Sequence, residues 1–86
     1  MISFPNTSRN YQVSKQSVCF WGYDSAFEIS FFVGRDMLER IADRPSTGEA
    51  DLLQIFDANR PQIQEVAARA YSSRRGNYYP LAQKDF

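Results

Sequence analysis

The sequence predicts an α+β fold in two layers, in which a small antiparallel sheet of three to four strands packs on two helices. Residues 17–33 are rich in β-branched and aromatic side chains, which is typical of strands. Residues 35–74 instead carry apolar side chains at steps of three and four, which indicates helices. Residues 78–82 form one closing strand, which Pro80 confines to an edge or a bulge. Strands that precede helices favour helices on one face of an antiparallel sheet.

The chain length favours a single domain over residues 1–86. A chain of 86 residues is long enough for one domain and too short for two. Residues 1–9 are rich in polar side chains and proline and are expected to form an extended N-terminal arm, which Phe4 could anchor. The domain should therefore consist of one small core with an arm attached to it.

Charge and cysteine content indicate a soluble cytoplasmic protein. Ten basic and ten acidic residues cancel, so no overall field draws in nucleic acid or an anionic membrane. One cysteine excludes an internal disulfide, and the stretch MISFPNTSRNYQ lacks the pattern of a signal peptide. No apolar run approaches the roughly 20 residues of a membrane helix.

The strand-like region predicts a hairpin with aromatic side chains on both faces. A short strand over 11–13 precedes two longer strands over 17–23 and 26–33, which Asp24 and Ser25 join in a turn. Alternation of side chains divides the hairpin into two faces. The core face holds Val18, Phe20, Phe27, Ile29 and Phe31. The opposite face holds Cys19, Trp21, Tyr23, Glu28, Ser30 and Phe32. A small domain has one core, so the second set of aromatic side chains needs a cover.

Three covers for Trp21, Tyr23 and Phe32 are open at this point. The N-terminal arm with Phe4, or the C-terminal Phe86, could fold back over them. The face could instead pack on a second copy of itself in a homodimer. It could also form a groove for another partner, because exposed apolar patches rimmed by polar groups mark interaction sites and aromatic residues commonly anchor them.

The helical region is expected to begin with a helix over residues 35–44 that ends before Pro45. Ser46 and Glu49 then match a capping box, in which Ser46 would cap the first amides of the next helix. These signals separate the first helix from the second.

The second helix is predicted to be long and kinked at Pro61. Its apolar stripe consists of Leu52, Phe56, Asn59, Ile63, Val66 and Ala70. Because the stripe holds its phase through Pro61, we predict one helical rod over residues 48–74. Two abutting helices are the alternative.

The residue types argue against an enzyme. The chain has no histidine, so the commonest general base is missing, and a single cysteine cannot form a metal site alone. Asp36, Glu39 and Asp43 lie among arginines at helical spacing, which is typical of a solvated helix face. We expect no catalytic residue, no cofactor and no metal, and we interpret Cys19 as an apolar filler rather than a redox sensor.

A basic segment over residues 69–79 offers a second functional hypothesis. It contains Arg69, Arg74 and Arg75 together with Tyr71, Tyr78 and Tyr79. These side chains could bind phosphates and stack on bases. The alternative is that the arginines compensate a helix dipole and the tyrosines are half-buried strand residues, which we favour.

Four blocks of the sequence carry a resemblance to a known family. They are FPNTSRNY, FWGYDSAFEISFFV, LLQIFDANR and YYPLAQKDF. In their order and spacing they resemble the small bacterial family called domain of unknown function 1488, over nearly the whole chain. The resemblance implies a two-layer α+β fold with the order β-β-β-α-α-β. It implies no activity and no site residues.

The functional hypothesis from sequence is a non-enzymatic cytoplasmic protein-interaction domain. Its interaction face would comprise Cys19, Trp21, Tyr23 and Phe32, and a homodimer could form through it. The alternative is weak nucleic-acid binding, or a regulatory accessory role, through Arg69, Arg74, Arg75, Tyr78 and Tyr79.

Overall fold

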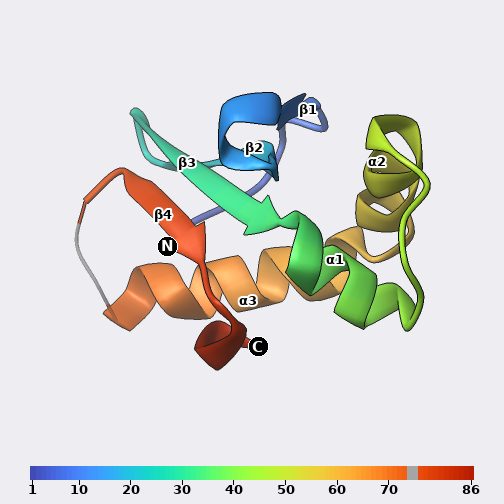
Figure 1. Ribbon diagram of the computed structural model, residues 1–86. Helices are drawn as coiled ribbons and strands as arrows, with labels where there is room; N and C mark the ends of the chain where they lie inside the picture. The colour runs from blue at the N-terminus through green and yellow to red at the C-terminus, as the bar shows by residue number, and fades with distance from the viewer. Residues whose placement is uncertain (74–75) are drawn as a thin grey trace.

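The computed structural model describes residues 1–73 and 76–86, with side chains for 1–71 and 76–86. Its elements in chain order are β1 (Arg9–Gln12), η1 (Val13–Lys15), β2 (Ser17–Asp24), β3 (Phe27–Gly34), α1 (Arg35–Ala42), α2 (Glu49–Ala58), α3 (Arg60–Ser73), β4 (Tyr78–Leu81) and η2 (Gln83–Asp85). The predicted α+β class is confirmed, although three α-helices rather than two separate the third and fourth strands (Figure 1).

The four strands form one sheet in the order β1-β2-β3-β4. The first three pair antiparallel, but β4 runs parallel to β3, with Ser30 opposite Tyr78 and Val33 opposite Leu81. The prediction of a fully antiparallel sheet is therefore wrong. Figure 1 shows the reason: α3 runs back beneath the sheet toward the end where β3 begins, so the next strand must run in the same direction as β3. β4 lies at an edge, as Pro80 indicated.

The predicted single helix over residues 48–74 is wrong, and the alternative of two abutting helices is correct. α2 ends at Ala58 and α3 begins at Arg60. The break falls at Asn59, whose amide donates to the carbonyl oxygen of Phe56 at 3.1 Å while its Nδ2 donates to that of Ile55 at 2.8 Å, so the side chain takes up the bond that the amide makes in a continuous helix. Pro61, which lacks an amide hydrogen, falls in the first turn of α3, where none is needed.

The core lies between the sheet and the helices and contains the predicted helical stripe. The sheet contributes Val18, Phe20, Ile29, Phe31, Val33, Tyr79 and Leu81. The helices contribute Leu38, Leu52, Ile55, Phe56, Ile63, Val66, Ala67 and Ala70. The ring of Phe20 joins the two sets, since its centroid lies 5.4 Å from that of Phe31 and 5.0 Å from that of Phe56. Phe27 was expected on this face but is 73% exposed, because it sits at the tip of the hairpin.

The N-terminal arm enters the core side of the sheet. Ser3 and Tyr23 exchange two backbone hydrogen bonds, of 2.9 and 2.8 Å, so the arm extends the line of β1 along β2. The ring of Phe4 then lies 5.8 Å from that of Phe31. The prediction that Phe4 could anchor the arm is confirmed, but it does so in the core and not over the outer aromatic side chains. Phe86 likewise packs against the core.

The turn between α1 and α2 differs from the predicted capping box. Gly48 is the N-cap of α2 and no side chain caps it. Ser46 instead donates from both its amide and its hydroxyl to Glu39, at 2.9 and 2.7 Å. The capping box was wrong because the helix starts too late for Ser46 to reach its amides. Among the described residues, no helix is long and apolar enough to cross a membrane.

Candidate functional site: the outer face of the sheet

The side of the sheet opposite the core carries the aromatic residues that sequence analysis singled out. We call this surface the outer face and define it by Cys19, Trp21 and Tyr23 on β2, Glu28, Ser30 and Phe32 on β3, and Tyr78 on β4. Trp21 and Tyr78 both stand opposite Ser30, so these three residues form one row across the sheet. Cys19 stands opposite Phe32 in the next row.

Lys15 covers the part of the outer face around Phe32. Its Nζ lies 5.4 Å from the ring centroid of Phe32 and 5.2 Å from that of Tyr78, and it donates to the Tyr78 hydroxyl at 2.8 Å. The Tyr78 ring lies 4.8 Å from the Phe32 ring. Phe32 is therefore only 7% exposed although it lies on the side of the sheet away from the core, because an aliphatic lysine stem and a neighbouring ring exclude water.

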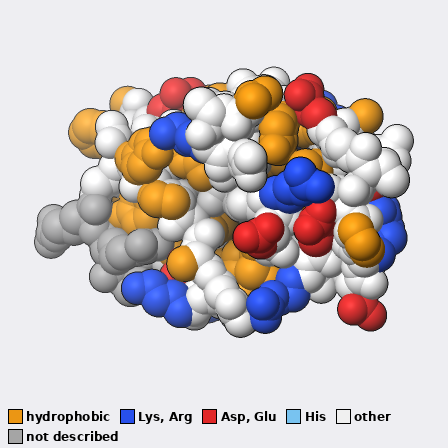
Figure 2. All heavy atoms as spheres, viewed as in Figure 1, with side chains coloured by type: hydrophobic (Ala, Val, Ile, Leu, Met, Phe, Trp, Pro, Cys, Tyr) orange, Lys and Arg blue, Asp and Glu red, His pale blue; other side chains and the backbone are white. Residues whose placement is uncertain are grey.

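The rest of the outer face is more open. Tyr78 is 52% exposed and Trp21 is half-buried. The hydroxyl of Tyr23 donates to Glu28 at 2.8 Å and accepts from the Asn6 side chain at 3.2 Å, so the arm contacts the face at this end. Figure 2 shows hydrophobic side chains gathered over the strands, while charged side chains gather over α1.

Opposite charges lie at the two ends of the outer face. Lys15 lies at the level of Phe32, beside a hollow of about 180 Å³ that it lines together with Gln16, Gly34, Arg35 and Asp36. Glu28 is exposed at the other end of β3. The aromatic row around Ser30 lies between a cation and an anion.

Cys19 lies beneath this face and is unsuited to redox chemistry. Its side chain is 2% exposed. Burial raises the pKa of the thiol, and the charge of Glu28 adds to this effect more than Lys15 opposes it. The thiolate is therefore disfavoured, which supports the interpretation of Cys19 as an apolar filler.

The described residues of the nucleic-acid hypothesis do not form one surface. Arg69 forms an ion pair with Glu65 at 2.8 Å, and Arg74 and Arg75 lie outside the described residues. Tyr79 is 2% exposed in the core, on the face of β4 opposite to Tyr78. Of the two strand tyrosines, only Tyr78 could stack on a base.

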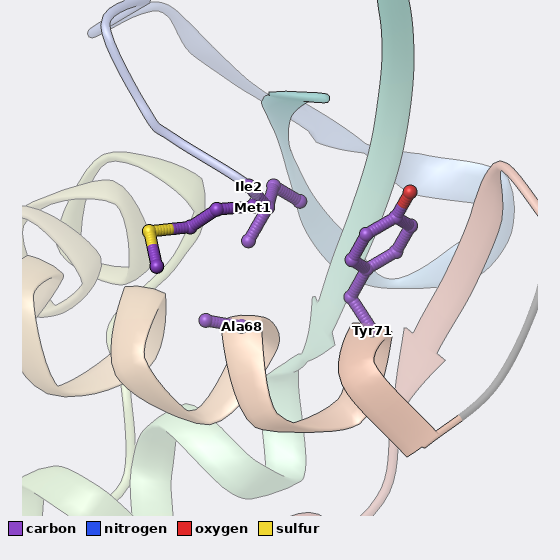
Figure 3. Close-up of a pocket in the computed structure, with 4 residues that line it drawn as sticks. All are labelled: Met1, Ile2, Ala68 and Tyr71. Atoms are coloured by element: carbon purple, nitrogen blue, oxygen red, sulfur yellow. The ribbon is translucent and has the colours of Figure 1, made fainter. Parts of the chain in front are cut away.

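Another hollow lies between the arm and α3. It has a volume of about 570 Å³ and is lined by Met1, Ile2, Ala68 and Tyr71 (Figure 3). Its lining is mostly apolar, and the Tyr71 hydroxyl donates to Asp24 at 2.5 Å, a hydrogen bond that raises the pKa of Tyr71.

The carboxylate of Glu39 on the first helix has structural partners. Glu39 accepts hydrogen bonds from Ser46 and from Arg35, at 3.1 Å for the latter, and these bonds lower its pKa to about 2. Among the described residues, no three potential metal ligands of the His, Cys, Asp or Glu type converge. Lys15 is the residue that sequence analysis missed, because its role depends on the path of η1 across the face.

The family model "Protein of unknown function (DUF1488)" matches residues 2–81. The chain belongs to the DUF1488 family. A solved structure described as a protein of unknown function from this family, from Shewanella loihica PV-4, is similar over 93% of this chain and 90% of that one. The TM-score is 0.83 at 18% sequence identity, so the similarity extends to the fold alone. No curated protein matched the chain. Membership in the DUF1488 family confirms the resemblance seen in the sequence and assigns no activity.

Proposed function

We propose that this DUF1488 chain is a non-enzymatic, cytoplasmic protein-interaction domain that binds its partner through the outer face. The observation that carries the proposal is the aromatic cluster on the side of the sheet away from the core. Phe32 is covered by the side chains of Lys15 and Tyr78, and Tyr78 is itself half exposed. Exposed apolar patches rimmed by polar groups are characteristic of interaction sites, and aromatic side chains are their usual anchors.

The free edge of β4 is a poorer site than the outer face. The carbonyl oxygen of Asn77 accepts a backbone hydrogen bond from Ser30 and therefore points toward β3. Because backbone groups alternate in direction along a strand, the amide and carbonyl of Tyr79 point toward β3 as well. The backbone groups of Tyr78 and Pro80 then point toward the open edge, and proline has no amide hydrogen to donate there. Pro80 thus disfavours the addition of another strand at this edge. A partner should engage the side chains of the face rather than the backbone of the edge.

The absence of an enzymatic role is supported by the chemistry of the two described hollows. The larger is apolar, and its hydroxyl on Tyr71 is bound by Asp24. The smaller is a shallow hollow of about 180 Å³ lined by Lys15, Arg35 and Asp36. A chain without histidine would need a perturbed carboxylate or lysine as its general base. The pKa of Glu39 is lowered, which makes this carboxylate a weaker base.

Nucleic-acid binding through the basic segment remains the second candidate. It is supported only by the exposed ring of Tyr78 near Lys15. A salt titration against mixed DNA and RNA separates the two candidates, because phosphate-driven binding weakens steeply with salt and an apolar interface responds little.

A photo-cross-linking experiment in the native host tests the interaction face. A photoreactive p-benzoylphenylalanine replaces Ser30, at the centre of the aromatic row, or Gln62, an exposed control position on α3. We expect a discrete protein adduct from position 30 and none from position 62. Equal labelling from both positions, or no adduct from position 30, would contradict the proposal.

A further inference from the structure

The charges of the outer face are arranged about its central row. Ser30 lies midway along β3 between Phe32, where Lys15 sits, and Glu28. Each of these positions is two residues from Ser30, or about 7 Å along the strand. The row of Trp21, Ser30 and Tyr78 crosses the sheet between the cation and the anion.

We propose that the occupant of the outer face is a second copy of this chain, related by a twofold axis that runs along the row of Trp21, Ser30 and Tyr78. This inference rests on the proposed interaction function. The axis lies between the two sheets, so each strand of one copy lies antiparallel over the same strand of the other. Lys15 of each copy then meets Glu28 of the other, and Trp21 meets Trp21. Such a contact is isologous, and the strands stack in the aligned manner of packed sheets.

The charges select this arrangement over the other way of stacking the two faces. A twofold axis along the strand direction would set Lys15 against Lys15 and Glu28 against Glu28. Like charges in a desolvated contact are strongly unfavourable, whereas opposite charges fix the register of an interface. With the axis along the central row, Lys15 of one copy lies against Glu28 of the other at both ends of the face, and both contacts are attractive.

The size of the face indicates a weak dimer. β2 and β3 have eight residues each, and β1 and β4 have four each. At about 3.3 Å per residue and about 4.8 Å between strands, the flat area is about 400 Å² per copy. A standard interface buries about 800 Å² per partner, so this dimer belongs to the weak, reversible class.

Charge reversal tests the arrangement by sedimentation over a concentration series. The wild type should dimerise reversibly, and Lys15→Glu and Glu28→Lys should each weaken dimerisation by about tenfold or more. The double variant, and an equal mixture of the two single variants, should both recover the wild-type affinity because every Lys–Glu contact is restored. Lys84→Glu, an exposed change of the same sign on η2, should have no effect.

Several outcomes would overturn the inference. Single variants that dimerise like the wild type, or a mixture that fails to recover, would exclude this pairing. If a variant loses its circular dichroism signal, the concentration series of the wild type decides the matter. A wild type that is monomeric at every concentration excludes the second copy. In that case, an adduct of position 30 to a different protein would still support the interaction function, and no adduct would reject both.

Discussion

The guanidinium of Arg44 binds both carboxylate oxygens of Asp51, at 2.7 and 2.8 Å, and so ties the end of the α1 segment to the first turn of α2. Asp51 also accepts the Thr47 amide at 2.9 Å, and together these bonds lower its pKa. On α1, the carboxylate of Glu39 likewise accepts hydrogen bonds from Ser46 and Arg35. Two carboxylates with lowered pKa values, Glu39 and Asp51, thus hold the connection between α1 and α2.

We expect the stability of the domain to fall in acid because of this connection. The pKa of Glu39 lies at about 2 in the folded chain against an ordinary value of 4.5. The unfolded chain therefore takes up a proton first, so the stabilising contribution is fully present above pH 4.5 and is lost as the pH falls toward 2. The free energy of unfolding in urea, measured over this range, should fall less steeply in Glu39→Gln than in the wild type. Ser46→Ala is a second test, because it removes the hydrogen bond that lowers the pKa of Glu39 most. It should likewise reduce the dependence of the free energy of unfolding on pH.

Substitution of Phe56 should strongly destabilise the domain. Its ring is fully buried and lies 5.0 Å from that of Phe20. Phe56→Ala leaves a cavity in the core and should cost about 3–5 kcal/mol in the free energy of unfolding. Phe27→Ala is the matched control, because Phe27 is 73% exposed, and it should cost at most about 0.5 kcal/mol. Equal losses for the two variants would show that the stripe does not hold the core together.

Gly22 should tolerate no side chain while the arm is docked. A Cβ at this position would lie 2.8 Å from both the Ile2 Cδ1 and the Phe4 Cε1 atoms. Gly22→Ala should therefore cost about 1–3 kcal/mol, as overpacking does, and Phe4→Ala in the same chain should cause little additional loss. Gly34→Ala is the control, since its Cβ would meet only the Ser17 hydroxyl at 3.8 Å. A Gly22→Ala variant as stable as Gly34→Ala would mean that the arm is not held in the core.

Lys15 should contribute to stability through its cover of Phe32. Lys15→Ala removes the hydrogen bond to Tyr78 and the aliphatic stem above the ring. We expect a loss of about 0.5–1.5 kcal/mol in the free energy of unfolding, and Lys15→Met should recover part of it by restoring the apolar stem. Lys84→Ala should leave the stability unchanged. If Lys15→Ala also behaves like the wild type, the lysine does not shield the outer face.

The parts of the fold that sequence analysis predicted correctly depend on periodic patterns. Alternation along the hairpin placed Phe20 and Phe31 inward and Cys19 and Phe32 outward, as the strand register has them. The apolar members of the helical stripe, Leu52, Phe56, Ile63, Val66 and Ala70, all lie in the core, whereas Asn59 lies at the break between the two helices. Phe56 and Ile63 are both fully buried on opposite sides of the break.

The errors arise where one side chain decides the path of the backbone. Asn59 ends α2 through a bond to Ile55 that no pattern reveals. Because α3 is then a separate helix, it can return across the sheet and make β4 parallel. The role of Lys15 depends on a single turn of η1, in which Gln16 adopts a left-handed conformation with φ of 46°. Contacts that join distant residues through irregular backbone have no periodic signature in the sequence.

The parallel pairing of β4 also constrains the order of folding. The β2–β3 hairpin closes through a tight turn, whereas Ser30 and Tyr78 meet only after all three helices lie between them. Loop closure over such a separation is slow, so β4 should join last. Until then β3 presents an unpaired edge beside Phe31, and chains that meet at this stage could join edge to edge and aggregate. Conditions that accelerate the docking of β4, rather than those that stabilise the hairpin, should improve the yield of refolded protein.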